Sequence, residues 1–239
     1  MTGAAPLDPV TLAVLKGRLE QIADEMDATL FRSAFNPIIA EAHDASHGLY
    51  DAATGDTLVQ GKSGLPIFVG SNAFAVRAVI DKVARDGDAG GLAEGDVFIF
   101  NDPYDGGTHL SDFRLVRPYW RDGRVFCWLA SVGHWHDVGG NVPGNYNPSA
   151  TESFQEGMLI PPVKLYDRGV FRQDIVDILM ANSRQPGSLY GDLNGQVSAL
   201  ELGERRLNDL LDEYGTARVG TALSELKKSA ARLMASFIS

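Results

Sequence analysis

The chain has 239 residues, of which 44% are apolar and 22% charged, which is the composition of an ordinary folded domain. The net charge of −10 argues against nucleic acid and anionic membrane surfaces as partners, because both attract basic proteins. The single cysteine, Cys127, excludes an intramolecular disulfide, and no apolar run approaches the ~20 residues of a membrane helix, so we expect a cytoplasmic protein.

An amphipathic helix is predicted over residues 9–33. Asp8 and Pro9 form a typical N-cap and first helical residue, and Asn36-Pro37 ends the segment. Between them, apolar residues recur at spacings of three and four, namely Leu12, Leu15, Leu19, Ile22, Met26 and Leu30. This one-sided pattern indicates a helix with one apolar face and one solvated face.

The next elements are short and alternate between strand and helix. Two runs, Gly48–Asp51 and Thr57–Gln60, flank an Ala-Thr-Gly turn and predict a β-hairpin. A helix follows, with Ser71 as its expected N-cap and an end near Gly87, and after it a short strand over Val97–Phe100.

Two longer strands are expected in the middle of the chain. Phe113–Trp120 is predicted to pair with Val125–Gly133 through the Arg-Asp-Gly turn between them. The second run is apolar at nearly every position, which is typical of a strand that is buried on both faces.

The last third of the chain is mainly helical. A strand-like run over Met158–Leu165 precedes a short helix over Asp174–Ala181 and two amphipathic helices over Val197–Tyr214 and Ala217–Phe237. The order of elements predicts one α+β domain over residues 1–239, with a mixed or antiparallel sheet and amphipathic helices at both ends.

Histidine and aspartate occur together in two glycine-bearing turns. His109 and Asp112 follow Gly106-Gly107 at a spacing of three, which places both side chains on one side of a tight loop. His134 follows at the end of the buried strand. Two imidazoles and one carboxylate from separate loops form a three-ligand set of the kind that binds divalent metals. The alternative is that they are turn residues that hydrogen-bond to nearby backbone.

A second question is whether His136 joins this cluster. It shares a strand face with His134 if the strand continues past Trp135, and one imidazole is then a ligand candidate and the other a proton carrier. Gly61-Lys62-Ser63 resembles the end of a phosphate-binding loop, but Asp56 stands where that motif requires its first glycine. The chain therefore shows no nucleotide site of its own.

Taken together, several motifs resemble the hydantoinase B/oxoprolinase family, which includes subunits of acetone and acetophenone carboxylases and of caprolactamase-type hydrolases. They occur in family order along most of the chain: GDVFIFNDPYDGGTHLSD at Gly95–Asp112, HWHDVGG at His134–Gly140, Gln155-Glu156-Gly157, IPPVKL at Ile160–Leu165, Asn182-x-Arg184-x-Pro186 and Gly191-Asp192-Leu193. The resemblance implies a divalent metal, zinc or manganese, held by His109, Asp112 and His134, with Asp44 as a fourth ligand.

One departure from the family pattern concerns the fourth ligand. The glutamate-arginine pair that precedes this aspartate in the family reads Glu41-Ala42 here, and His43 stands directly before Asp44. Asp51 is therefore retained as the alternative to Asp44. Four protein ligands would close a tetrahedral zinc site, so catalysis requires expanded coordination or a metal such as Mn²⁺.

The resemblance also implies a partner. In the family, an ATP-using hydantoinase A-like subunit phosphorylates a carbonyl or enol oxygen, and the metal-bearing subunit completes hydrolysis or carboxylation. In this scheme His136 and Glu156 are candidates for proton transfer, and Arg184 is a candidate for bidentate binding of phosphate or carboxylate. Each has a structural alternative: a hydrogen-bonded histidine, a loop carboxylate and a structural arginine.

The expected function is the metal-bearing subunit of an ATP-dependent enzyme that opens a cyclic amide in a small-molecule substrate. The alternatives are a subunit of an ATP-dependent ketone carboxylase, an iron oxygenase with the same three ligands, and a non-catalytic scaffold. Family subunits are usually much longer than this chain. We therefore expect a hetero-oligomer in which another chain supplies the missing C-terminal half and completes the core.

Overall fold

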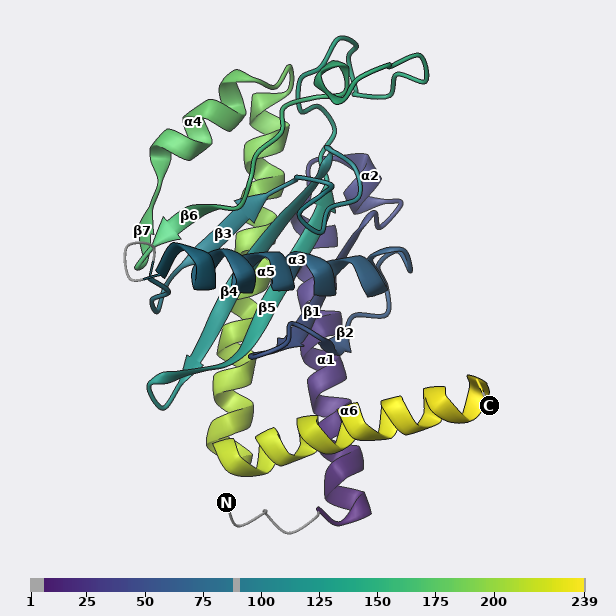
Figure 1. Ribbon diagram of the computed structural model, residues 1–239, viewed down its shortest axis with the longest axis vertical. Helices are drawn as coiled ribbons and strands as arrows, with labels where there is room; N and C mark the ends of the chain where they lie inside the picture. The colour runs from purple at the N-terminus through teal and green to yellow at the C-terminus, as the bar shows by residue number, and fades with distance from the viewer. Residues whose placement is uncertain (1–6, 88–90, 239) are drawn as a thin grey trace.

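An antiparallel sheet organises the computed structural model, which describes residues 7–87 and 91–238. Its seven strands lie in the order β2-β1-β5-β4-β3-β6-β7 (Figure 1), which confirms the predicted α+β class. The strands are β1 (Ala45–Asp51), β2 (Thr57–Gln60), β3 (Val97–Phe100), β4 (Asp112–Arg121), β5 (Arg124–His134), β6 (Val163–Asp167) and β7 (Val170–Phe171). The helices are α1 (Pro9–Ser33), α2 (Pro37–Ala40), α3 (Phe68–Asp86), α4 (Gln173–Ala181), α5 (Pro186–Tyr214) and α6 (Thr216–Ile238).

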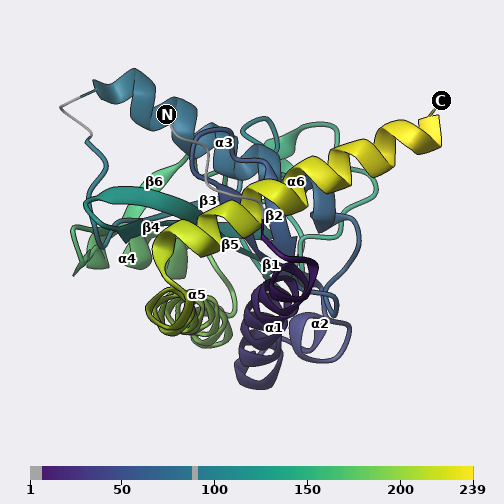
Figure 2. The ribbon, with the colours of Figure 1, turned by 90° about the horizontal axis from the view of Figure 1, so that it is seen from below.

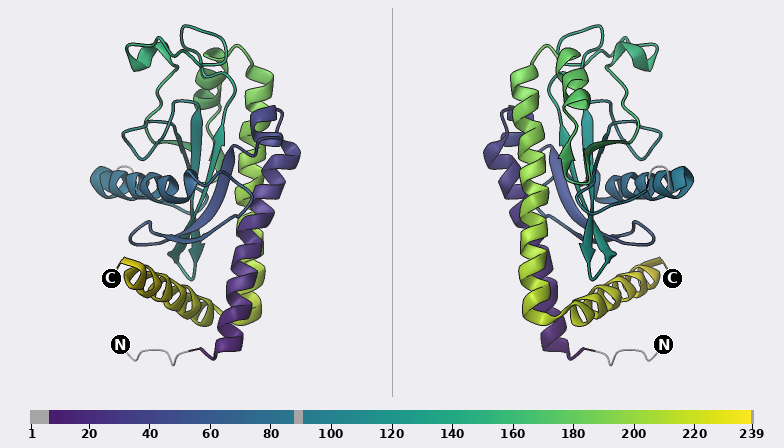
Figure 3. Two further views of the ribbon diagram at one scale, coloured as in Figure 1. Left: turned by 90° about the vertical axis from the view of Figure 1, so that its right-hand side faces the viewer. Right: turned by 90° about the vertical axis from the view of Figure 1, so that its left-hand side faces the viewer.

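Helices cover both faces of the sheet. The long helices α1 and α5 lie side by side on one face, and α3 crosses the other face (Figures 2 and 3). A large apolar core fills the space under α1 and α5, and a smaller one lies under α3. Strand β5 contributes Leu129 to the first core and Ala130 to the second, so the prediction of a strand buried on both faces is confirmed.

Three chain segments meet at one end of the sheet. Asp112, the first residue of β4, pairs in register with His134, the last residue of β5. Gly133 pairs with Ala45 at the start of β1, so Asp44 lies next to the same position. The loops that follow β5 gather above this end of the sheet (Figure 1).

The start of α5 differs from the prediction. The helix begins at Pro186 and not at Val197. Gly191 and Gly195 interrupt the apolar periodicity of the missed part, yet Gly195 has a packing role, because a Cβ atom there would lie 2.9 Å from Cδ1 of Leu30 on α1. Gly203, further along the helix, packs in the same way against Met26, whose sulfur would lie 2.6 Å from such an atom. Because close packing requires glycine at these positions of α5, the apolar pattern of the helix is interrupted there.

Three smaller differences have local causes. Helix α3 begins at Phe68, so Ser71 lies inside the helix and the expectation that it is the N-cap was wrong. Strand β6 starts only after Pro161 and Pro162, which have no N–H group for a ladder. The short α2 and β7 were not predicted, whereas the other predicted helices and strands are confirmed. Among the described residues, no helix combines the length and apolarity needed to cross a membrane.

Candidate metal centre

Two imidazoles and one carboxylate meet where β4 begins and β5 ends. The ligand atoms of His109, Asp112 and His134 all lie within 4.8 Å of one another. Nδ1 of His109 is 2.7 Å from Oδ2 of Asp112, and Nδ1 of His134 is 2.9 Å from Oδ1. The structure thus brings together the three residues that the sequence singled out as ligands.

Strand pairing and a tight turn create this arrangement. The β4–β5 register sets Asp112 directly opposite His134. His109 reaches the same point because the Asp112 N–H donates to the His109 carbonyl at 3.1 Å, while the His109 N–H donates to Oδ2 of Asp112 at 3.1 Å. The spacing of three residues therefore places the side chains of His109 and Asp112 on one side of the turn, as predicted.

The environment keeps Asp112 ionised. Its side chain is fully buried, and burial alone would raise its pKa, but hydrogen bonds with His109, His134 and Thr108 outweigh that effect and hold the pKa far below its usual range. The same hydrogen bond with Asp112 raises the pKa of His109. The His109 side chain is 65% exposed and that of His134 22% exposed, so solvent reaches the imidazoles and not the carboxylate.

A buried arginine lies behind the cluster and was missed in the sequence. Arg114 donates to the Asp112 carbonyl at 3.0 Å and to the Thr108 hydroxyl at 3.0 Å, and this hydroxyl donates to the Asp112 carboxylate. Burial lowers the pKa of Arg114 to about 10, against the opposing charge of Asp112. The available signal was a charged residue inside an apolar strand, two positions after Asp112 and so on the same face.

Asp44 lies beside the three-residue cluster. Its Oδ2 is 3.8 Å from Nδ1 of His134. Burial raises the pKa of Asp44, and the negative charge of Asp112 adds to the rise while His134 opposes it. Asp51 lies at the other end of β1, where it accepts from Nζ of Lys227 at 3.2 Å. Of the two predicted alternatives, the structure places Asp44 next to the cluster.

A cavity of about 310 Å³ opens onto the two imidazoles. The chain between residues 144 and 148 forms part of its wall, and Glu156 also lines it. A larger hollow of about 550 Å³ lies between α6 and the β1–β2 hairpin, where Asp51 and Lys227 pair with each other and Lys228 is a further charged residue. Of these two spaces, the smaller cavity is the one that His109 and His134 line.

His136 does not join the cluster. Strand β5 ends at His134, and Trp135 turns into the core, where it stacks on Phe113 with ring centroids 3.9 Å apart. His136 is half-buried, and it opposes the rise that burial causes in the pKa of Asp192 on α5. The condition for a shared strand face is therefore not met.

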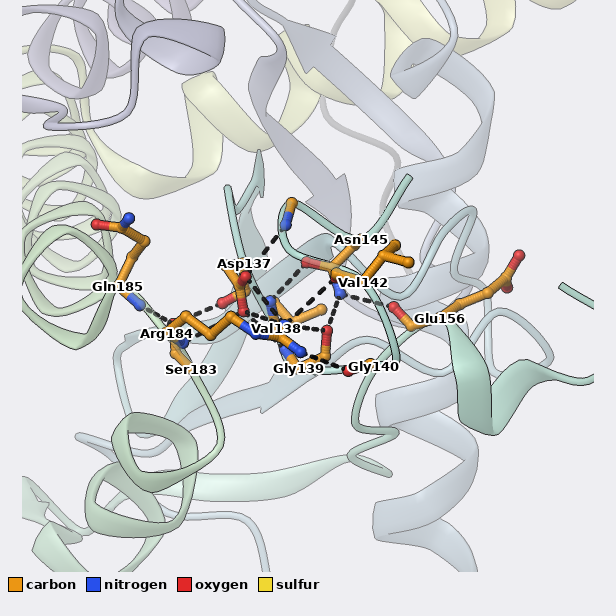
Figure 4. Close-up of polar contacts among 11 residues, drawn as sticks. Asp137, Val138, Gly139, Gly140, Val142, Asn145, Glu156, Ser183, Arg184 and Gln185 are labelled. Atoms are coloured by element: carbon orange, nitrogen blue, oxygen red, sulfur yellow. Dashed lines mark hydrogen bonds and ion pairs between the residues drawn. The ribbon is translucent and has the colours of Figure 1, made fainter. Parts of the chain in front are cut away.

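Arg184 and Asp137 form the centre of a loop network (Figure 4). The guanidinium Nη1 lies 3.2 Å from Oδ2 of Asp137, which is buried. Nη1 also donates to the carbonyl oxygens of Gly139 and Val142, and Nη2 donates to that of Gly140, all in the loop after β5. Arg184 is not among the residues that line the cavity. Its contacts hold the loop in shape.

Asn145 connects this loop network to the cavity wall and was not singled out in the sequence. Its Oδ1 accepts from the Val138 N–H at 2.7 Å, and its Nδ2 donates at 2.7 Å to the carbonyls of Gly139 and Glu156 (Figure 4). Its φ of 63° lies in the left-handed region, which asparagine tolerates better than most residues. Since Asn145 also lines the cavity, the network sets the position of that wall.

The chain is similar in sequence to several known proteins. The chain is 39% identical over 228 residues to the caprolactamase subunit beta of Pseudomonas jessenii, covering 95% of this chain and 38% of that protein. It is 30% identical to the 5-oxoprolinase of Dictyostelium discoideum, covering 96% of this chain and 18% of that protein. It thus spans about two fifths or less of the length of these curated relatives.

Solved structures and a family model agree with these relatives. The crystal structure of the ATP-dependent caprolactamase from Pseudomonas jessenii superposes with a TM-score of 0.84 at 38% identity, covering 97% of this chain and 39% of that chain. Nucleotide-free acetone carboxylase shares the fold, with a TM-score of 0.82 at 22% identity over 90% of this chain and 28% of that chain. The model described as hydantoinase B/oxoprolinase matches residues 8–239. The chain belongs to the hydantoinase B/oxoprolinase family.

Proposed function

We propose that this chain is the metal-bearing part of an ATP-dependent enzyme that opens a cyclic amide. The observation that carries the proposal is the cluster of His109, Asp112 and His134, whose two imidazoles line a cavity of about 310 Å³ that suits a small ring. A 39% identical relative is named as a caprolactamase subunit, and a lactam is a cyclic amide.

The donor set fits a divalent cation. Imidazole nitrogen and carboxylate oxygen are ligands for zinc and manganese, and His109, Asp112 and His134 would hold the ion with Asp44 as the fourth ligand. Burial, and after it the negative charge of Asp112, raises the pKa of Asp44, so two carboxylates lie close together in a partly buried place. A bound cation would offset that charge.

The residues around the cavity would orient the substrate and move a proton. When bound, the divalent ion supplies polarisation of a carbonyl oxygen or activation of a water molecule. We assign proton transfer to Glu156 in preference to His136, because Glu156 lines the cavity and His136 does not. We assign Arg184 to holding the loop, because its guanidinium is occupied by Asp137 and by backbone carbonyls.

ATP would act on a partner. The sequence lacks a phosphate-binding loop, and the similar protein from Pseudomonas jessenii is a beta subunit of an ATP-dependent enzyme. A hydantoinase A-like subunit that phosphorylates the substrate is the partner that this division of labour requires, which makes the assembly a hetero-oligomer.

A further polypeptide would cover the outer half of α6. The apolar stripe that packs Val219 and Leu223 into the core continues to Leu233 and Phe237, which are 60% and 78% exposed. The spacing of this stripe alternates between three and four residues, as in helices that pack along their length. We propose that the polypeptide corresponding to the unmatched part of the longer relatives packs there.

Metal analysis tests the central proposal. We expect near-stoichiometric zinc or manganese, measured by mass spectrometry, in the purified wild type and in His136→Ala, a matched histidine variant outside the cluster. Asp112→Ala and His134→Ala should lose the metal while circular dichroism shows an intact fold. A wild type that takes up neither metal after reconstitution would contradict the proposal and favour a non-catalytic scaffold.

Turnover distinguishes hydrolysis from carboxylation. With ATP and the partner subunit, ring opening of a lactam should proceed without bicarbonate. A strict requirement for bicarbonate would favour a ketone carboxylase, whose fold this chain shares.

A further inference from the structure

Two buried polar residues of α5, Asp192 and Gln196, lie beneath the strand ends that carry the ligands. Both side chains are fully buried. A spacing of four residues places them on the same face of the helix. Burying polar groups is costly unless they are hydrogen-bonded, so their partners indicate what they do.

Gln196 contacts the neighbours of two metal ligands. Its Nε2 donates to the Phe113 carbonyl at 3.0 Å, and its Oε1 accepts from Nε1 of Trp135 at 2.9 Å. Phe113 directly follows Asp112, and Trp135 directly follows His134. One amide group therefore ties together the two strands at the residues next to their ligands.

The orientation of this amide is itself fixed. Nε2 of Gln196 also donates to Oγ of Ser131 at 3.2 Å, and this hydroxyl lies 2.9 Å from Nε2 of His47. Nδ1 of His47 lies 2.8 Å from Oδ1 of Asp27 on α1. All four side chains are fully buried. A continuous hydrogen-bonded chain thus runs from α1 through the sheet to α5.

Asp192 acts on the backbone of His134 through Asn36. Its Oδ1 accepts from the N–H groups of Phe35 at 2.8 Å and Asn36 at 3.2 Å. Nδ2 of Asn36 donates to the carbonyl of His134 at 2.6 Å. Asp192 therefore holds the residue that holds the backbone of a ligand.

We propose that Gln196 and, through Asn36, Asp192 are positioning residues of the metal centre, an inference that rests on the proposed metal site. They fix the ends of β4 and β5, so that the side chains of Asp112 and His134 meet at ligand spacing before metal arrives. Neither residue lines the cavity, so neither touches substrate. Groups that orient metal ligands in this way typically contribute about 10- to 100-fold to metal affinity.

The first test uses a matched pair of variants. Gln196→Met keeps the length of the side chain and removes its hydrogen bonds. Tyr119→Phe removes the 2.7 Å hydrogen bond from Tyr119 to Asn208, which also joins β4 to α5 but lies far from the ligands. The dissociation constant for Zn²⁺, from competition with a chromophoric chelator, and the Tm are measured for both.

We expect both variants to lower the Tm, because each loses a hydrogen bond between a strand and α5. Only Gln196→Met should weaken Zn²⁺ binding, by about 10- to 100-fold. Wild-type Zn²⁺ affinity in Gln196→Met would overturn the positioning role and leave the metal site intact. If the wild type binds neither Zn²⁺ nor Mn²⁺, the proposed function and this inference both fall.

A second pair decides the case in which Gln196→Met does not fold. Asp192→Asn keeps an oxygen that accepts from Phe35 and Asn36, whereas Asp192→Ala removes it. We expect Asp192→Ala to weaken Zn²⁺ binding by about tenfold or more and Asp192→Asn to restore most of the affinity. Equal affinities in the two variants would overturn the role of Asp192.

Discussion

The carboxylate of Asp137 should be the main support of the loop that walls the cavity. It is 2% exposed. Its Oδ1 accepts from the N–H groups of Gly139 and Arg184, and its Oδ2 accepts from the Gly144 N–H and the Arg184 guanidinium. The guanidinium also lies 3.4 Å from Oδ1. In Asp137→Asn one oxygen becomes an NH₂ group, so at least two of these five contacts are lost whichever way the amide turns.

The size of the effect follows from these contacts. A hydrogen bond to a charged acceptor contributes about 1.5–3 kcal/mol. The Arg184 side chain is 42% exposed, so solvent screens its ion pair and the contribution falls to about 0–1 kcal/mol. We therefore expect Asp137→Asn to lower the free energy of unfolding at pH 7 by about 2–4 kcal/mol.

The effect should depend on pH in a definite direction. Burial raises the pKa of Asp137, but the N–H groups of Gly144, Gly139 and Arg184, together with the guanidinium, outweigh burial and lower it. The folded pKa then lies below the unfolded value of about 3.9. The stabilisation is present above the unfolded pKa and is lost as pH falls through the folded pKa.

Urea unfolding at pH 7 and at lower pH measures both effects. Asp209→Asn is the control, because Asp209 is 66% exposed and 3.8 Å from Arg206, and we expect it to change stability by less than about 0.5 kcal/mol. A loss below about 0.5 kcal/mol for Asp137→Asn at pH 7 would refute the reasoning. So would a loss that stays constant into the acid range.

Three further results are expected. Asp44→Ala should weaken Zn²⁺ binding by about tenfold or more in an equilibrium titration, while Asp51→Ala leaves it unchanged, and equal affinities would remove Asp44 from the ligand set. Gly203→Leu should lower the free energy of unfolding by about 1–3 kcal/mol in urea, because it overpacks the α1–α5 contact, whereas Gly187→Ala, which has open space, should not; equal stabilities would contradict that packing. Combined glutamate substitutions at Leu233 and Phe237 should abolish co-purification with the remaining part of a caprolactamase beta subunit and leave the Tm unchanged. The control Ser229→Glu should leave both co-purification and the Tm unchanged, and retained co-purification of the double variant would remove α6 from that interface.

Local determinants made α1 predictable. Oδ1 of Asp8 accepts from the Thr11 N–H at 2.9 Å, and the helix ends at Ser33, just before the Asn36-Pro37 signal. The first half of α5 was missed because Gly191 and Gly195 interrupt its apolar pattern. Gly195 packs against Leu30 of α1, and Gly191 packs against Phe35, just after α1. The apolar periodicity of α5 depends on packing against a segment more than 150 residues earlier in the chain, so it does not predict this half of the helix.

The three residues of the cluster could be predicted from the sequence, and their surroundings could not. His109, Asp112 and His134 flank strands that pair with each other, so spacing and pairing are enough to bring them together. The contacts of Arg184 depend on which loop lies opposite it, and no spacing in the sequence encodes that. The turn at His136 likewise depends on Trp135 stacking against a strand end.

The distance between Asp112 and His134 is set partly at the other end of the β4–β5 hairpin. Asp122 and Gly123 have φ values of 53° and 73°, the signature of a two-residue type I′ turn, which sets Arg121 opposite Arg124. The ladder then runs, through one bulge, to the ligand pair. A slip of one residue would turn the side chain of His134 to the other face of the sheet.

Burial on both faces of β5 opposes such a slip, because it would exchange Leu129 and Ala130 between the two cores. The packing that stabilises the sheet thus also protects the spacing of the ligands. Gly123→Val strains the turn by about 1–2 kcal/mol and should lower the Tm. Its Zn²⁺ affinity should equal that of the wild type, because the cores still hold the register. A weakened affinity would show that the turn, and not the packing of β5, holds Asp112 opposite His134.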